Sequence, residues 1–133
     1  MSGESRMRIG DLAERTGTTP QTIRYYEQLG LLAPLEREGR GYRHYGEEAV
    51  ARLHKIATLK QIGLSLEEIR DVIDLYFVDD TGIHGKRKVL EILKRHRQET
   101  DEKIASLQGF RAELDQSIAR VERLIRDIEA AQQ

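Results

Sequence analysis

Residues 19–30 read TPQTIRYYEQLG, and this short stretch decides the fold. Thr19 is a good N-cap, so we expect a helix to begin directly after it. Adjacent residues of a helix point in different directions, so Tyr25 and Tyr26 cannot both enter one core. We expect Tyr26, three residues after Ile23, to be buried and Tyr25 to face outward.

A second helix is expected just before this one. Residues 7–17 read MRIGDLAERTG, in which Ile9, Leu12 and Ala13 recur at helical spacing and Gly17 stops the helix. Two short helices joined by a few residues that include glycine are typical of a helix-turn-helix unit.

The segments that follow predict a hairpin and two more helices. Residues 31–35 and 42–45 are expected to be two short strands around a tip rich in glycine and arginine. Residues 47–63 have the pattern of an amphipathic helix. Ser65 and Glu68 form a capping-box pair that opens the next helix. Residues 78–86 contain two aspartates and two glycines, which predicts a linker.

The last third of the chain has a heptad repeat. Nine of the twelve residues at the two seam positions between 90 and 128 are apolar, and the exceptions are Arg97, Thr100 and Arg111. A helix over residues 87–130 is about 65 Å long at about 1.5 Å per residue, so it cannot bury its seam against a small head. We therefore expect a homodimer, with these seam residues at the interface: Leu90, Leu93, Ile104, Leu107, Leu114, Ile118, Val121 and Ile125.

Composition excludes several kinds of protein. The chain has 133 residues and no cysteine, which removes disulfides and thiolate metal sites and agrees with a cytoplasmic protein. No apolar run approaches the length that spans a bilayer, so we expect no membrane partner. The net charge of −1 does not by itself point to nucleic acid. No nucleophile–base pattern or phosphate-binding glycine loop is present, so we expect no enzyme activity.

A group of polar and basic residues predicts contact with DNA. Four of the seven aromatic residues lie between residues 25 and 45, where arginines also gather. Guanidinium groups and phenols suit phosphate oxygens, and Gln21 at a helix start can read a base edge. The candidates from these features are Thr19, Gln21, Thr22, Arg24, Tyr25, Arg40, Arg43 and Tyr45.

These motifs, in this order, resemble the MerR family of transcription regulators. The matching stretches are residues 9–13 (IGDLA), 22–27 (TIRYYE), 30–32 (GLL), 41–45 (GYRHY) and 62–69 (IGLSLEEI), and the long helix has the family's place and length. The resemblance implies a mainly α fold, with a winged helix-turn-helix head over residues 7–77 and an antiparallel dimeric coiled coil over 87–130. Residues 1–6 are expected to be a disordered lead.

The resemblance also implies a mechanism. Family members bind a pseudo-palindromic promoter site as dimers and distort it, which acts on RNA polymerase through the DNA. By position, Arg24 and Tyr25 would grip the backbone from the recognition helix, with Thr22 and Gln21 beside them. Arg43 and Tyr45 would do so from the wing, and Lys60 would reach a flanking phosphate.

Other readings stay open at this point. A helix-turn-helix head on a coiled coil also suits a protein-interaction module, or an architectural protein that bends DNA without activating transcription. We expect no metal and no cofactor, although Asp79, Asp80 and His84 leave a carboxylate–histidine site conceivable. The effector, if one exists, is a small molecule that the sequence does not identify.

Overall fold

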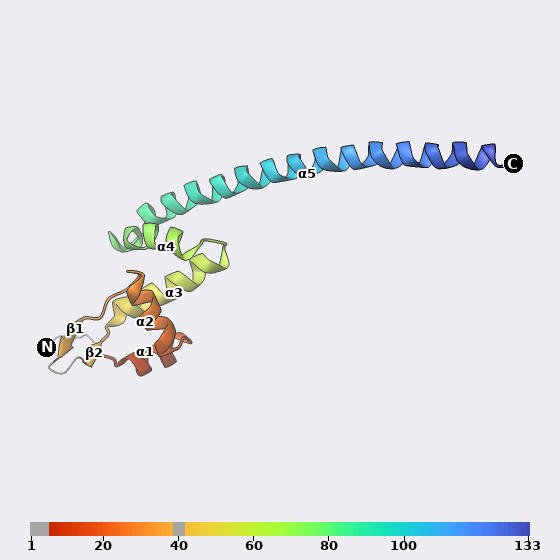
Figure 1. The fold of residues 1–133 in the computed structure, drawn as a ribbon. Helices are drawn as coiled ribbons and strands as arrows, with labels where there is room; N and C mark the ends of the chain where they lie inside the picture. Colours follow the sequence, from red (N-terminus) through yellow and green to blue (C-terminus); the bar gives the residue numbers. More distant parts are fainter. Residues whose placement is uncertain (1–5, 39–41) are drawn as a thin grey trace. The chain divides into compact units, whose positions relative to one another are not determined.

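A computed structural model describes residues 6–38 and 42–133 of the chain. The chain divides into two compact units, Met1–Val89, here called the head, and Leu90–Gln133, here called the tail. Figure 1 shows short helices and a small hairpin in the head and one continuous helix in the tail. The expected lead at residues 1–6 lies outside the described residues except for Arg6.

The head begins with the two predicted helices, α1 (Ile9–Thr16) and α2 (Pro20–Gln28). Between them Gly17 has φ 69°, a left-handed conformation that glycine adopts without the steric cost of a Cβ. The turn is held by a hydrogen bond from the Thr18 N–H to the Ala13 carbonyl at 2.9 Å. Leu12, Ala13, Ile23 and Tyr26 are buried, so both helices bury the faces that their spacing predicted.

The hairpin differs from the prediction in its first strand. β1 is Glu36–Glu38 and β2 is Tyr42–His44, paired antiparallel with Arg37 opposite Arg43. The expected strand over residues 31–35 is wrong, because Leu31 and Leu32 are buried in the core instead of alternating between two faces. The pairing begins only at the Leu35 N–H, which donates to the His44 carbonyl at 2.8 Å.

Three further elements complete the core of the head. These are α3 (Glu47–Gln61), α4 (Leu66–Val72) and the 3₁₀ helix η1 (Ile73–Phe77). The predicted capping box is confirmed: the Ser65 N–H donates to Glu68 Oε1 at 3.0 Å, and the Glu68 N–H donates to Ser65 Oγ at 3.2 Å. α3 packs against α1, α4 and η1, so it forms the centre of the head.

The long helix α5 (Ile83–Ala131) begins earlier than expected. The predicted linker over residues 78–86 is therefore too long by four residues. Asp79 explains the early start, since its Oδ1 accepts hydrogen bonds from the Thr81 N–H at 2.9 Å and the Gly82 N–H at 3.2 Å. Thr81 Oγ1 in turn accepts from the Ile83 N–H at 3.1 Å, which satisfies a free donor at the helix start.

Apolar side chains of the tail are largely uncovered. Every residue from 97 onward is exposed, including Leu107 at 68% and Ile118 at 55%. Leu90 is also exposed at 52%, and Leu93 is half-buried. In the residues that the structure describes, no helix is both long and apolar enough to cross a membrane.

Candidate nucleic-acid interface

The start of α2 is organised by two threonines. Thr19 Oγ1 accepts a hydrogen bond from the Thr22 N–H at 3.1 Å and donates one to Thr22 Oγ1 at 3.0 Å. These hydroxyls therefore cap the helix and hold one another. Gln21 is exposed and its side chain makes no hydrogen bond within the described residues, so its amide is available to a partner.

Next along α2, adjacent residues point to opposite environments. Tyr26 is 7% exposed and belongs to the core, whereas Tyr25 is 50% exposed. The two ring centroids lie 6.2 Å apart with planes tilted by 40°. Arg24 is exposed beside Tyr25. One face of α2 therefore packs into the core of the head, and the other exposes a guanidinium and a phenol to solvent.

Tyr45 lies elsewhere than expected. Its side chain is fully buried, its hydroxyl hydrogen-bonds to Glu27, and its backbone pairs with Met7. The expected DNA contact of Tyr45 needs an exposed phenol, and this side chain is not exposed. The residue instead ties the hairpin to α2 and to the segment before α1.

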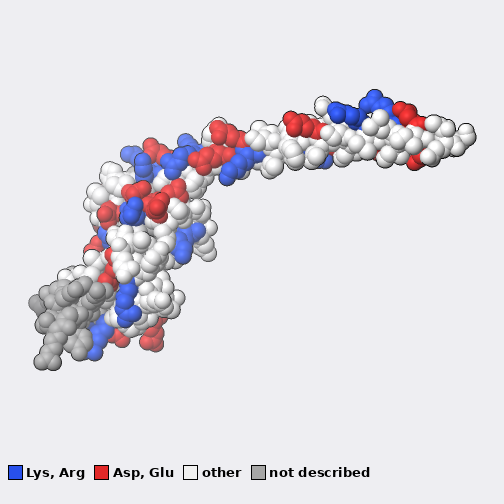
Figure 2. All heavy atoms as spheres, in the orientation of Figure 1, with Lys and Arg blue, Asp and Glu red and all other residues white. Residues whose placement is uncertain are grey.

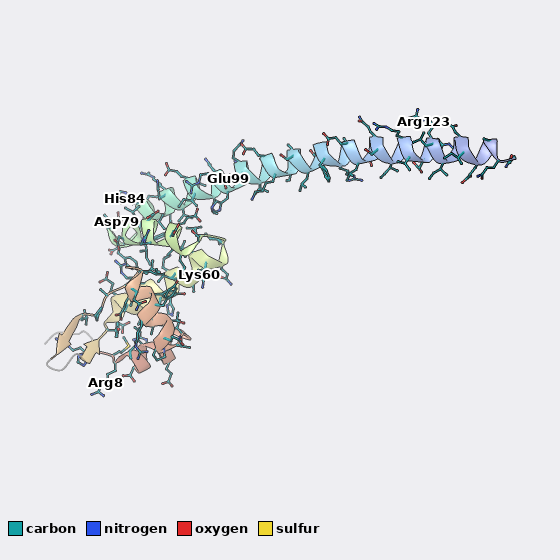
Figure 3. All side chains as sticks on the ribbon, viewed as in Figure 1. Arg8, Lys60, Asp79, His84, Glu99 and Arg123 are labelled. Atoms are coloured by element: carbon teal, nitrogen blue, oxygen red, sulfur yellow. The ribbon has the colours of Figure 1, made fainter. Side chains whose placement is uncertain are left out.

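The other wing candidates are placed only in part. Arg40 lies outside the described residues, and Arg43 is described only through its backbone pairing with Arg37. Lys60 stands in the last turn of α3 and is exposed (Figure 3). Arg24 of α2 and Lys60 of α3 are thus exposed basic side chains, and α4 adds a third.

That further side chain, Arg70, was not among the sequence candidates. It is exposed and lines a depression of about 150 Å3 together with Tyr25, Leu29, Leu66 and Glu67. Glu67 brings a negative charge to the same depression. The sequence signal was present, because Arg70 lies in a predicted helix, but nothing in the spacing says that α4 borders α2.

Ion pairs separate structural arginines from available ones. Arg15 is bound to Glu47 through two contacts of 2.6 and 2.8 Å. The hydrogen bond from Arg15 lowers the pKa of Glu47 below its ordinary value. Arg52 binds Asp74 at 2.8 Å and the Leu31 carbonyl at 3.1 Å.

By contrast, Arg24, Lys60 and Arg70 have no carboxylate partner among the described residues. The charge of these three side chains is therefore not compensated by a neighbouring carboxylate, which distinguishes them from Arg15 and Arg52.

Two of the residues considered for a metal site interact with other groups of the chain. Asp79 caps the start of α5, and its hydrogen bond from the Thr81 hydroxyl lowers its pKa. His84 Nε2 lies 3.8 Å from Asp79 Oδ2 (Figure 3). Within residues 6–38 and 42–133, no group of three or more His, Asp or Glu side chains is close enough to hold a metal ion.

Two family models match the chain. One, described as MerR HTH family regulatory protein, matches residues 7–75, and the other, described as MerR, DNA binding, matches residues 50–117. The chain belongs to the MerR family. The resemblance to this family that the motifs carry is confirmed. The family is one of regulators and not of enzymes.

Individual relatives agree with this assignment. Nodulation protein NolA of Bradyrhizobium sp. (strain NC92) is 37% identical over 109 residues, which are 82% of this chain and 42% of NolA. This MerR-family chain thus spans about two fifths of the length of that relative.

Solved structures agree as well. PbrR691 from Ralstonia metallidurans CH34, solved in complex with lead(II), is 32% identical with a TM-score of 0.64, covering 81% of this chain and 82% of PbrR691. HiNmlR, a MerR family regulator lacking the sensor domain and bound to promoter DNA, shares the fold at 24% identity and a TM-score of 0.53. That match covers 86% of this chain and 89% of HiNmlR.

Proposed function

We propose that this regulator binds a pseudo-palindromic promoter site as a homodimer and acts on RNA polymerase by distorting the DNA between the half-sites. The observation that carries the proposal is the division of α2: Ile23 and Tyr26 are buried, while Arg24 and Tyr25 are exposed and Arg24 has no carboxylate partner. HiNmlR, which has the same fold, was crystallised on promoter DNA. The proposal also places the protein in the cytoplasm, together with the promoter DNA.

In this proposal Arg24, Tyr25 and Lys60 contact phosphates, and Arg40 and Arg43 do so from the wing. Gln21 is the candidate for a base edge, with Thr19 and Thr22 holding the helix start beside it. Phosphate contacts supply affinity without sequence information, whereas the amide of Gln21 can recognise a base. Distorting DNA costs free energy that the phosphate contacts offset.

The dimer is proposed to form through α5. Its exposed apolar stripe includes Ile104, Leu107, Leu114, Ile118 and Val121, which are 46–68% exposed in the single chain. In Figure 2 most charged atoms of the second half of α5 lie along one edge, and the rest of the visible face of that half is largely uncharged. A second copy of the same helix covers such a stripe and removes it from water.

Charge along α5 favours an antiparallel pair. The residues directly after the second seam position are basic at the start of the helix and acidic later: Arg87, Lys94, Asp101, Gln108, Asp115, Glu122 and Glu129. In an antiparallel pair this row faces its own copy running in the opposite direction, so basic residues meet acidic ones. A parallel pair offers no such match, because each row then faces the residues just before the first seam position.

The test is a gel shift with a palindromic site from the gene's own promoter region, measured at several salt concentrations. Arg24→Ala should weaken binding at least tenfold across sequences and reduce the salt slope by about two, because the proposed dimer loses one phosphate contact in each half-site. Arg126→Ala, which removes the same charge near the far end of α5, is the matched control and should bind as the wild type does.

Three results would change the proposal. A change of base preference in the Arg24 variant would mean that this residue reads sequence. Wild-type protein that shows no salt-sensitive, sequence-selective binding would favour the protein-interaction module instead. DNA bending with unchanged transcription in vitro would favour the architectural role.

A further inference from the structure

A small recess lies in the head at the base of α5. It has a volume of about 200 Å3 and is bordered by α3, η1, the segment before α5 and its first turn. Its size is below the range of drug-sized ligand pockets, so it suits a compact group. The residues that line it are Ala51, Lys55, Tyr76, Phe77, Asp80, Thr81, Gly82 and Lys86. We call it the Tyr76 recess.

Two ammonium groups share one aromatic ring in this recess. Lys55 Nζ lies 4.5 Å and Lys86 Nζ 5.5 Å from the centroid of Tyr76. Lys86 also donates a hydrogen bond to the Thr81 carbonyl at 2.8 Å. Within the described residues, neither lysine forms an ion pair with a carboxylate.

This arrangement leaves positive charge uncompensated. The ring face attracts each ammonium group, but two like charges at one ring also repel each other. Asp80 is the one carboxylate that lines the recess, and it forms no ion pair with either lysine. The lining therefore has a surplus of one positive charge, which an anion placed between the lysines would neutralise.

The ring of Tyr76 is also tightly held against the start of α5. A Cβ added to Gly85 would lie 2.3 Å from Tyr76 Cδ2 and 2.6 Å from Cε2, so only glycine allows the ring this close. A Cβ added to Gly82 would also lie close to the ring, at 3.1 Å from Tyr76 Cδ1. Because the ring touches the backbone of α5, a ligand that moves Tyr76 also bears on the first turn of that helix.

We propose that the Tyr76 recess binds a compact free anion, the carboxylate or phosphate group of a small molecule, between Lys55 and Lys86. Binding at this point links the occupancy of the recess to the first turn of α5. Its regulatory consequence rests on the proposed function, whereas the binding itself does not.

Binding is tested by calorimetric titration of the full chain with inorganic phosphate and, separately, with acetate, at constant ionic strength set by chloride. We expect saturable binding of at least one of these anions. The double variant Lys55→Gln/Lys86→Gln should weaken it at least tenfold. The control Lys88→Gln/Lys103→Gln removes two positive charges from α5 outside the recess and should bind the anion as the wild type does.

A second pair of variants guards against a general loss of structure. Lys55→Arg/Lys86→Arg keeps both charges and should retain binding, and circular dichroism should show equal helix content in all variants. The proposal is overturned if neither anion binds saturably, or if the Gln double variant binds as tightly as the wild type.

A DNA-binding experiment distinguishes a failure of anion binding in the recess from a failure of the proposed function. Gel shifts at matched ionic strength should respond to the bound anion in the wild type and not in the Gln double variant. If the protein fails to bind DNA, the titrations above still decide whether the anion binds. If the double variant loses DNA affinity and no free anion binds, the lysines serve DNA phosphates and the proposal is wrong.

Discussion

The head and the tail use the same apolar side chains in opposite ways. In the head, Leu12, Ile23 and Ile69 are completely buried. In the tail, Leu107 and Ile118 are more than half exposed. The head therefore supplies its own core, while the tail displays a stripe that gains stability only when another helix covers it.

This difference also changes what stabilises the helices in the two regions. Helices of two or three turns are stable in the head because α3 packs against several neighbours. From residue 97 onward α5 has no such support in the single chain, so its continuity there depends on helix propensity, to which the proposed dimer would add.

The largest expected effect comes from making one substitution in both regions. Ile23→Ala removes a fully buried side chain and should lower the free energy of unfolding of the head by about 2–5 kcal/mol. Ile118→Ala, at 55% exposure, should leave the head intact and weaken only the dimer. Urea unfolding followed by circular dichroism at fixed protein concentration measures both. Equal losses of head stability in the two variants would break the comparison.

The next effect tests what covers the tail. Leu107→Asp places two charges in each proposed dimer interface and should raise the dimer dissociation constant about 100-fold, or about 2.7 kcal/mol. Sedimentation over a range of concentrations measures the change. Ala105→Asp adds the same charge off the seam and should leave the dimer intact. Dimers of unchanged strength in the Leu107 variant would mean that the seam is not the interface.

A smaller effect concerns the end of a head helix. Ser65→Ala removes the hydroxyl that accepts from the Glu68 N–H at 3.2 Å and should cost about 1 kcal/mol. Ser117→Ala is the matched change in the tail helix, where alanine favours helix and no cap is lost. The urea midpoint should fall in the Ser65→Ala variant and should stay equal or rise in the Ser117→Ala variant. A Ser65 variant as stable as the wild type would show that α4 is held by packing alone.

The smallest effect is a pH dependence in the head. The pKa of Glu47 is lowered from 4.5 chiefly by its hydrogen bond from Arg15, so the ionised form is favoured in the folded state. The stability that the Arg15–Glu47 ion pair contributes is therefore present above pH 4.5. It is lost as the pH falls through the pKa that Glu47 has in the folded protein, which is lower. The difference in Tm between wild type and Glu47→Gln should shrink below pH 4.5, unlike that of Glu113→Gln, which removes an exposed carboxylate away from the seam. A difference that stays constant with pH would contradict this.

Much of the fold could be predicted because its signals are local. The cap at Thr19, the helix stop at Gly17 and the box of Ser65 with Glu68 each act within four residues, and the structure confirms all three. The expected strand over residues 31–35 was wrong because burial in the core, a tertiary effect, outweighed the local pattern.

The candidate site was predictable to a smaller extent. Arg24 and Tyr25 have the exposure that the spacing around Ile23 predicted. Tyr45 lacks the predicted exposure, because its phenol is buried and hydrogen-bonds to Glu27, a residue eighteen positions earlier in the chain. Which arginines are available also depended on distant partners, since Arg15 binds Glu47 across 32 residues.

The sequence by itself determined the helix periods, their caps and the heptad stripe, because these arise from interactions between residues one or two turns apart. Only the tertiary structure decided that Tyr45 is buried, that Arg52 is bound to Asp74, and that Lys55 and Lys86 meet at Tyr76. Those contacts join residues from different elements, and their geometry is set when the elements pack. No spacing along the chain records that geometry.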